Sequence, residues 1–388
     1  MSTIWKWRWW IGPPLVVSML VVLSWPYGSR WWRHRRQQGF FRSCSRAQRD
    51  RNWAELGSIA ERWCRWQPSS ADAWLFRADA AQRKGDFADA AEYLSSIPES
   101  DPKALPALAG LSILQFGRLN RPLDGEQTCK RILALEPRAT AAHQRLIEFY
   151  AITLQRQKLI HEIDYAIRMR REHPAAYVYL FLVDTMRLVN GVEENSKWLK
   201  ANPNAELFLV ARALQLPEPV VGADAAVSNK HYAIAALFKR FPENTELLAY
   251  EVDLAIRVGD VNKVVRLLKL APPAVNNDSR FWRAKGWLYL NRHQFHKARK
   301  ALQHAIELQP LDWNARNWMA DLARRQGDLK KADHLQNMVR QARRLREEIT
   351  NQGTAEKVST KVLAGLKDYA RRCGDLPVAD ALRRRLSR

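Results

Sequence analysis

The chain has 388 residues, and its 63 Lys and Arg outnumber 40 Asp and Glu to give a formal net charge of +23 at pH 7. Only 16 residues are Gly, and the sequence contains no phosphate-binding Gly loop, dinucleotide fingerprint, His-Glu-x-x-His or Gly-x-Ser-x-Gly. These features argue against the common nucleotide-dependent, zinc-dependent and serine hydrolase enzymes. We therefore expect a protein that is not an enzyme, with no catalytic residue, no cofactor and no evident small-molecule substrate.

The first 36 residues have the pattern of a membrane anchor. An uncharged run extends from Trp9 to Tyr27, and these 19 residues, at about 1.5 Å each, are just long enough for a hydrocarbon core of about 30 Å. Tryptophans flank the run on both sides, as in the aromatic belts of membrane helices. We expect a transmembrane helix at about 9–27. A cleaved signal peptide ending near Ser24 is the alternative.

The charges around this run predict its orientation. Lys6 and Arg8 precede it, whereas six arginines follow it between Arg30 and Arg46. The positive-inside bias then predicts a single-pass membrane protein with its remaining domain on the cytoplasmic face, although export to the opposite face stays open. Four dispersed cysteines form no Cys-x-x-Cys pair and suit a reducing compartment: Cys44, Cys64, Cys129 and Cys373.

A hexapeptide recurs along the rest of the chain. GDFADA occupies 85–90, GDVNKV 259–264, HQFHKA 293–298, GDLKKA 327–332 and GDLPVA 374–379, and the three middle copies are spaced by 34 residues. Gly permits the left-handed backbone that ends one helix, Asp can cap the next helix, and the apolar residue shares a face with the Ala or Val three positions later. The repeat therefore predicts helical hairpins.

The hairpins resemble tetratricopeptide repeats. Residues 279–312 carry the family's signature at Trp282, Gly286, Tyr289, Phe295, Ala298, Ala305 and Pro310, and residues 71–104 carry a similar set from Trp74 to Pro102. Other structural repeat positions are Gly85, Ala90, Gly259, Gly327, Ala332, Gly374 and Ala379. Residues 105–244 show only helical periodicity. The resemblance implies an all-α fold, a right-handed superhelical solenoid of about ten hairpins.

These patterns divide the chain into four parts. Residues 1–36 form the anchor with a basic juxtamembrane segment, and 37–345 form the solenoid. Residues 346–359 are expected to be a linker or insertion, because Gly327 and Gly374 are 47 positions apart instead of 34. Residues 360–388 form a degenerate repeat with a basic tail. Two prolines in 215–227 predict a long loop, followed by a turn at 228–230.

The resemblance also implies a binding surface, since the first helices of such repeats line a concave groove. The groove positions carried over are Arg280, Arg283, Trp287, Leu290, Asn291, Asn314, Asn317, Asp321, Arg324 and Arg325, preceded by Glu246, Ala249, Asp253, Ile256 and Arg257. We expect Arg283 and Trp287 to hold an acidic, partly apolar segment. The alternative is that Trp287 only packs between neighbouring hairpins. Trp287 and Trp318 occupy positions where the family's carboxylate clamp needs Asn, which argues against a C-terminal carboxylate ligand.

Function is therefore predicted as protein binding by a membrane-anchored scaffold or adaptor. Two alternatives stay open. Residues 1–50 carry a net charge of +8 and residues 316–388 a net charge of +9, so these basic ends could bind nucleic acid or anionic lipid. The chain could also be a non-catalytic subunit of a membrane enzyme or export complex. His293, His296 and His304 lie close in sequence, but no Asp, Glu or Cys completes a metal ligand set, so no metal site is predicted.

Overall fold

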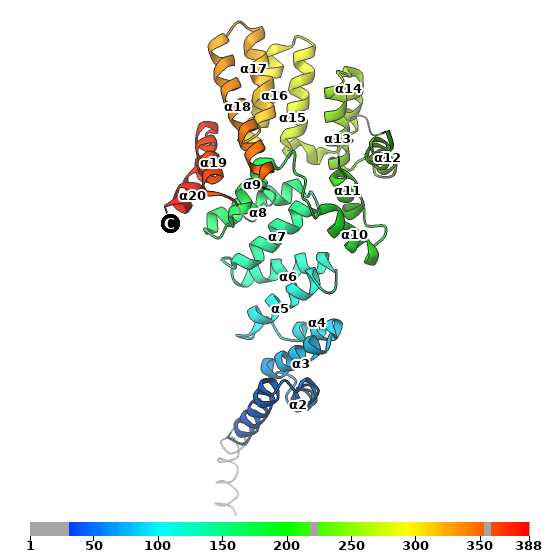
Figure 1. Cartoon of the computed structure of the whole chain (residues 1–388), viewed down its shortest axis with the longest axis vertical. Coiled ribbons are helices and arrows are strands. Elements are labelled where there is room, and N and C mark those ends of the chain that lie inside the picture. Colours follow the sequence, from blue (N-terminus) through cyan, green and yellow to red (C-terminus); the bar gives the residue numbers. More distant parts are fainter. Residues whose placement is uncertain (1–30, 218–223, 353–357, 388) are drawn as a thin grey trace, which may run out of the picture. The chain divides into compact units, whose positions relative to one another are not determined.

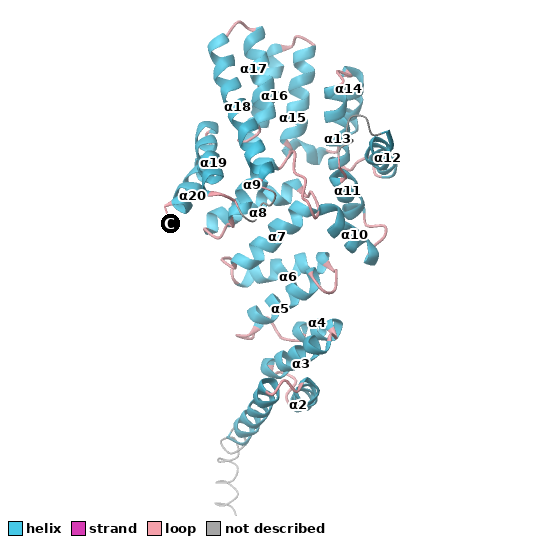
Figure 2. Cartoon of the chain, in the orientation of Figure 1, coloured by secondary structure: helices cyan, strands magenta, loops and turns pink. Residues whose placement is uncertain are grey.

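The computed structural model describes residues 31–217, 224–352 and 358–387, and their regular structure is helical throughout, without a strand (Figures 1 and 2). The all-α prediction is confirmed for these ranges. The predicted transmembrane helix at 9–27 lies outside the described residues. Within them, every helix is either too short or too polar to cross a membrane.

The first of two compact units extends to Leu119. Its described part contains a helix over 31–49 and four further helices: α2 (Trp53–Trp66), α3 (Ala71–Lys84), α4 (Phe87–Ser95) and α5 (Ala104–Phe116). Trp63 is fully buried, and its ring stacks on Phe40 with centroids 5.8 Å apart. This aromatic pair joins the helix over 31–49 to α2, so the first hairpin has a core of its own.

The second unit begins at Asn120. Its helices are α6 (Pro122–Leu135), α7 (Thr140–Ile152), α8 (Arg156–Met169), α9 (Pro174–Leu182), α10 (Gly191–Ala201), α11 (Glu206–Gln215), α12 (Asp224–Arg240), α13 (Thr245–Arg257), α14 (Val261–Leu270), the 3₁₀ turn η1 (Pro273–Asn277), α15 (Ser279–Asn291), α16 (Phe295–Leu308), α17 (Trp313–Arg325), α18 (Leu329–Asn351), α19 (Thr360–Cys373) and α20 (Leu376–Leu386). Most consecutive helices pack against one another, most extensively α15 with α16 and α17 with α18.

The recurring hexapeptides all occupy tight turns between paired helices. Gly85, Gly259, Gly327 and Gly374 have φ between 75° and 92°, the left-handed region that favours glycine. His293 takes the equivalent position in its own hairpin with φ 56°. The following Asp caps the second helix in three copies, where its side chain accepts a backbone N–H three residues on: Asp260, Asp328 and Asp375.

Close helix approach explains another signature glycine. Gly286 is buried on α15, and a Cβ atom built there would lie 2.5 Å from both Cγ and Cδ2 of Leu302 on α16. Ala298 is fully buried on the same facing helix. The absence of a side chain at Gly286 therefore permits the observed separation of the two helices.

Three boundaries differ from the expectations drawn from sequence. Helix α18 continues to Asn351, so the predicted linker 346–359 begins as helix. It can do so because Leu345 remains buried and packs beside Gly365 of α19. Helix α12 passes through 228–230, where a turn was expected. The segment 215–227 begins as the last residue of α11 and ends inside α12, while 218–223 lie outside the described residues.

The second unit also folds back on itself. Helix α20 packs against α8, and α19 packs against α9, although about two hundred residues separate them in sequence (Figure 1). Arg385 donates from Nη1 to the carbonyl oxygen of Glu172 at 3.1 Å, and Gln309 donates from Nε2 to the carbonyl oxygen of Leu180 at 3.1 Å. The middle helices α8 and α9 are thereby held by the last hairpin of the chain and by the connection between α16 and α17.

Candidate binding groove

The second unit contains a cavity of about 870 Å³, called here the groove pocket. Its walls come from the start of α8, from residues 183–187 after α9, and from α11, α12, α13, α15, α17 and α18. This volume lies within the range of about 300–1,000 Å³ that is common for ligand sites. The fold-back of the unit is what places helices from distant repeats around one space.

Helix α17 contributes aromatic rings and amides to the groove pocket. Trp313 and Trp318 lie on its wall together with Asn314 and Asn317, and all four side chains are partly exposed. Neither asparagine side chain forms a hydrogen bond with another described residue. An amide can donate and accept at once, so two amides beside apolar rings can bind the main chain of an extended peptide.

Buried ion pairs form one wall of the groove pocket. Arg156 Nε lies 2.7 Å from Asp184 Oδ1, and Arg283 Nη1 lies 2.8 Å from Asp184 Oδ2 and 2.6 Å from Asp312 Oδ2. Burial alone would raise the pKa of a carboxyl group, but the charges of Arg156 and Arg283 outweigh it and hold the pKa of Asp184 well below its usual range. Burial and the charge of Asp184 raise the pKa of Asp312. Arg283 therefore has both of its partners inside the protein.

Arg280 extends this network along α15. It binds Glu246 of α13 through two hydrogen bonds of 2.7 and 2.8 Å, and its Nη2 atom lies 2.7 Å from Asp278 Oδ2. The whole network contains three arginines and four carboxylates: Arg156, Arg280, Arg283, Asp184, Asp278, Asp312 and Glu246. With more acids than bases, it has no spare cation for a ligand.

Other cations of the groove pocket are more accessible. Arg187 and Arg346 are exposed on the wall of the groove pocket, and neither forms an ion pair with a carboxylate of the described residues. Arg257 is also exposed and lies 3.4 Å from Asp253, a surface pair that contributes little to stability. Lys230 is buried on α12, with its Nζ atom 5.8 Å from the ring centroid of Tyr250. The positive charge available to a ligand thus comes chiefly from the rim.

The structure brings only part of the predicted groove together. Among the positions expected from sequence, these line the groove pocket: Arg280, Arg283, Asn314, Asn317, Glu246, Ala249, Asp253, Ile256 and Arg257. Positions in the second halves of α15 and α17 lie elsewhere. Asn291 is exposed and donates to the carbonyl oxygen of Trp287, and Asp321 pairs with Arg325 at 3.0 Å and with Arg324 at 3.6 Å. Leu290 is buried in the core.

Two expected ligand contacts need correction. Trp287 is only 4 % exposed and belongs to a core cluster with Leu248, Val252 and Phe281, so it packs between hairpins. Arg283 does line the groove pocket, but it is 9 % exposed and both Asp184 and Asp312 bind it. The ring of Trp287 is covered by its core neighbours, and the guanidinium group of Arg283 is already bound by two carboxylates, so neither side chain is available to a ligand in the way expected.

Several residues of the groove pocket have no signal in the sequence. Arg156, Asp184, Arg187 and Lys230 come from the stretch 105–244, where only helical periodicity was recognisable. Their spacing from α15 exceeds the reach of a single repeat, so no local pattern could have grouped them. Among the described residues, no set of three or more His, Cys, Asp and Glu is arranged to hold a metal ion.

The comparison with protein families agrees with the hairpin geometry. The model of the family described as tetratricopeptide repeat matches residues 54–104 and 283–343. No curated protein matches the sequence. A tetratricopeptide repeat protein from Parabacteroides merdae is 11 % identical with a TM-score of 0.26. The match covers 72 % of this chain and 98 % of the Parabacteroides chain.

Two further solved structures are similarly distant. The human IFIT1 dimer with m7Gppp-AAAA is 12 % identical with a TM-score of 0.33, over 82 % of this chain and 79 % of that one. Yeast Tom70 is 14 % identical with a TM-score of 0.27, and the match covers 89 % of this chain and 84 % of Tom70. The family match, the glycine turns and the paired helices together support tetratricopeptide repeats in residues 54–104 and 283–343.

Proposed function

We propose that this chain is a non-catalytic adaptor, anchored in a membrane, that binds a segment of another protein in the groove pocket. The observation that supports this most directly is the pairing of free amides with apolar rings in one cavity of about 870 Å³. Repeat arrays of this kind offer extended concave binding surfaces. The ionic wall of the cavity is already saturated, which fits a binding site better than a site of proton transfer.

The expected ligand is an extended segment that is acidic and partly apolar. Asn314 and Asn317 would bind its main chain, and Trp313 and Trp318 would cover its apolar side chains. Arg187 and Arg346 on the rim would attract its acidic residues. In this proposal Arg283 and Arg280 shape the cavity through their carboxylate partners and do not contact the ligand charge.

Membrane anchoring is the second part of the proposal. The run 9–27 supports it from sequence, and the residues that follow suit an interface. Trp31 is 61 % exposed and Trp32 is 51 % exposed, and the guanidinium groups of Arg35 and Arg36 lie 5.1 Å from their respective ring centroids. Aromatic rings beside arginines are well placed near lipid headgroups. The excess of arginine after the run favours the cytoplasmic face for the repeats.

Site-specific photo-crosslinking in intact membranes tests the groove. A photoreactive amino acid at Asn317 should capture a partner, whereas the same group at Asn291, which is exposed on α15 outside the groove pocket, should not. The double variant Asn314→Ala, Asn317→Ala should reduce capture from a probe at Trp313 by about tenfold, since each lost hydrogen bond costs about 0.5–1.5 kcal/mol. Equal capture at Asn317 and Asn291 would remove the groove pocket as the binding site.

Salt dependence separates this function from binding of an anionic polymer. Polymer binding through the basic ends releases counter-ions and should weaken steeply as salt rises. Binding of a protein segment by amides and aromatic rings should weaken much less. The measurement is the crosslink yield at Asn317 across a salt series.

A further inference from the structure

A second cavity, of about 220 Å³, lies where the end of α8 meets the C-terminal helix α20. It is called here the arginine pocket. Six side chains that could contact an anion line it: Thr140, Arg170, Arg171, His173, Arg384 and Arg385. Arg170 and Arg171 follow directly on α8, and the other two arginines belong to α20. The fold-back of the second unit therefore brings four guanidinium groups together from segments more than two hundred residues apart.

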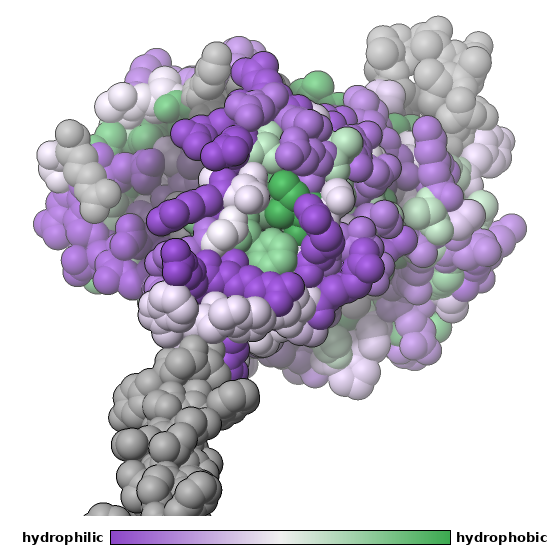
Figure 3. Space-filling model, turned by 90° about the horizontal axis from the view of Figure 1, so that it is seen from below, coloured by the Kyte–Doolittle hydropathy of each residue, from purple (hydrophilic) through white to green (hydrophobic). Residues whose placement is uncertain are grey.

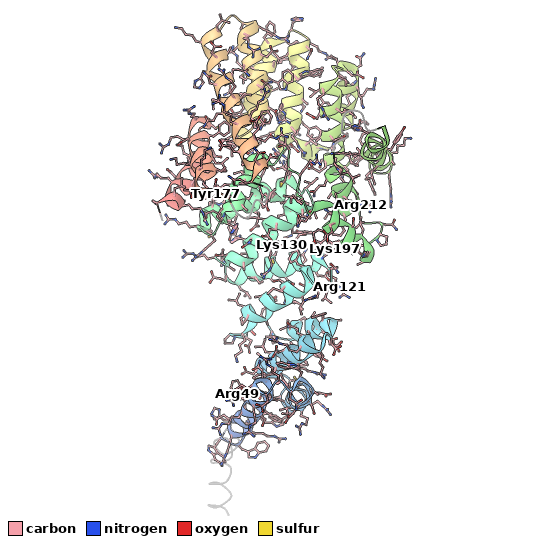
Figure 4. The ribbon with its side chains drawn as sticks, in the orientation of Figure 1. Arg49, Arg121, Lys130, Tyr177, Lys197 and Arg212 are labelled. Atoms are coloured by element: carbon pink, nitrogen blue, oxygen red, sulfur yellow. The ribbon has the colours of Figure 1, made fainter. Side chains whose placement is uncertain are left out.

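Backbone contacts fix the geometry of this corner. Arg170 ends α8 in the left-handed conformation, with φ 57°. Arg385 donates to the carbonyl oxygen of Glu172, which ties α20 to the segment between α8 and α9. Tyr177 of α9, labelled in Figure 4, donates its hydroxyl hydrogen to Glu172 Oε1 at 2.8 Å. The arginines are thus held on a supported frame and not on free tails.

The charges in the arginine pocket are unbalanced. Four arginines and one carboxylate, that of Glu172, give a charge of +3 before His173 is considered. None of the four arginines forms an ion pair with any carboxylate in the described part of the chain. The Nε atom of Arg171 is buried and has no hydrogen-bond partner there. Like charges held together in this way are costly unless an anion neutralises them.

The shape and donors of the cavity define the class of anion. Guanidinium groups bind phosphate oxygens through paired hydrogen bonds, and several arginines are needed to balance a dianion. The cavity is smaller than the 300 Å³ or so at which pockets for drug-sized ligands begin, so it suits a compact group. Figure 3 shows one face of the molecule, on which the described surface is mostly hydrophilic.

The geometry points to a binding site for a phosphate monoester group in the arginine pocket, carried either by a small soluble molecule or by a lipid headgroup. The site is separate from the groove pocket and does not depend on the function proposed for it. Because α20 supplies two of the four arginines, the bound anion also bridges α20 to the end of α8. Occupancy therefore stabilises the docking of the C-terminal hairpin.

Calorimetric titration of the full-length chain in a non-ionic detergent tests the site. Inorganic phosphate represents the soluble source, and a short-chain phosphatidic acid below its micelle concentration represents the lipid source. Either probe should bind saturably and raise the melting temperature more than chloride does at equal ionic strength. A response to only one probe identifies the source of the group.

Two variants assign the binding to this cavity. Arg384→Gln on α20 and Arg171→Gln beside α8 should each weaken binding by about tenfold or more, since hydrogen bonds to charged groups are worth about 1.5–3 kcal/mol. Arg383→Gln is the matched control, because Arg383 lies on the same helix, pairs with Asp380 at 3.1 Å and does not line the cavity. It should leave affinity within about twofold.

Three results would overturn the proposal. One is the absence of saturable binding by either probe. Another is an equal loss of affinity in Arg383→Gln and Arg384→Gln, which would indicate general attraction to the basic helix. A third is unchanged affinity in Arg171→Gln. Arg171 lies on the wall opposite α20, so this variant tests the site without changing α20 itself. Melting temperatures without anion show whether each variant is folded.

Discussion

Arg156 Nη2 lies 2.8 Å from Ser279 Oγ, although 123 positions separate the two residues in the sequence. Both residues are buried, and the same guanidinium group binds Asp184 through its Nε atom at 2.7 Å. Arg283 then links Asp184 to Asp312 at the start of α17. The start of α8, the segment after α9, and the starts of α15 and α17 are therefore joined by one ionic network. This network sets the shape of the groove pocket without supplying a free charge to it.

Removing Arg283 should be strongly destabilising. Arg283→Ala leaves Asp312 without its ion-pair partner and Asp184 with one partner fewer, and breaking a buried pair typically costs about 3–5 kcal/mol. Arg325→Ala is the control, since Arg325 pairs with Asp321 at 3.0 Å but is 38 % exposed. A surface pair of that kind is worth about 0–1 kcal/mol. Urea unfolding of both variants measures the difference. A similar loss of unfolding free energy in the two variants would show that the buried network does not stabilise the fold.

Local features of this fold were readable from sequence, whereas its fold-back was not. Gly327 and Asp328 determine a helix end and a helix start within a few residues, so their repetition predicts hairpins. Arg156 contacts Ser279 only because of the combined orientations of all the hairpins that lie between them in the sequence. A spacing pattern in the sequence does not predict these orientations. The same limit applies to Trp287: its helix position was predictable, but the neighbouring α13 decides that its ring is buried.

The residues that line the groove pocket divide in the same way. Asn314 and Asn317 follow from their positions in a repeat whose first helix and turn match the family pattern, and they do line the groove pocket. Arg187 and Lys230 lie in repeats too divergent to align by eye, so nothing in the sequence assigns them to a shared surface. The arginine pocket needs the packing of α20 on α8, which no short-range pattern contains.

His143 should make stability depend on pH. Its Nδ1 atom lies 2.5 Å from Glu162 Oε1 and its Nε2 atom lies 2.9 Å from the carbonyl oxygen of Pro137. Only the protonated ring can donate from both nitrogens. Burial lowers the pKa of His143, but the hydrogen bonds to Glu162 and Pro137 outweigh burial, so its pKa is raised.

A raised pKa fixes the sign of this effect. The stability that protonated His143 contributes is fully present below the pKa of histidine in the unfolded chain, about 6.5. It is lost as the pH rises through the pKa of His143 in the folded protein. The melting temperature should therefore fall more between pH 6 and pH 8 in the natural chain than in His143→Gln. These two pH values lie on either side of the unfolded pKa of about 6.5. His304→Gln, at an exposed site beside Glu307, is the control and should keep the slope. An identical slope in all three proteins would refute the role of His143.

Two glycines should respond oppositely to alanine. Gly286→Ala places a Cβ atom 2.5 Å from Leu302 and should cost about 1–3 kcal/mol through overpacking. At Gly57 of α2 the nearest atom, Ala80 Cβ, would lie at an ordinary 3.6 Å, so Gly57→Ala should stabilise by up to about 1 kcal/mol through helix propensity. Thermal unfolding measures both. A stabilised Gly286→Ala protein would mean that α15 and α16 are not as close as described.

The proposed anchor predicts how the protein fractionates. Full-length protein should remain in the membrane pellet after high-salt and carbonate washes, because a helix over 9–27 would hold it in the bilayer. A chain that starts at Gln37 should appear in the soluble fraction. Release of the full-length protein by carbonate would show that 9–27 do not span the membrane.

The last prediction concerns His293, which stands where other repeats have glycine. Its φ of 56° is left-handed, a conformation that costs a residue with a side chain about 1–2 kcal/mol. His293→Gly removes that cost but adds entropy to the unfolded chain and loses the contact of the ring with Phe295. A net stabilisation of about 0.5–1 kcal/mol is expected. His296→Gly is the matched control, since His296 is also exposed but lies in the first turn of α16, where replacing His with Gly should destabilise by roughly 0.3–0.5 kcal/mol. Denaturant midpoints that move in the same direction for both variants would show that the turn imposes no strain at His293.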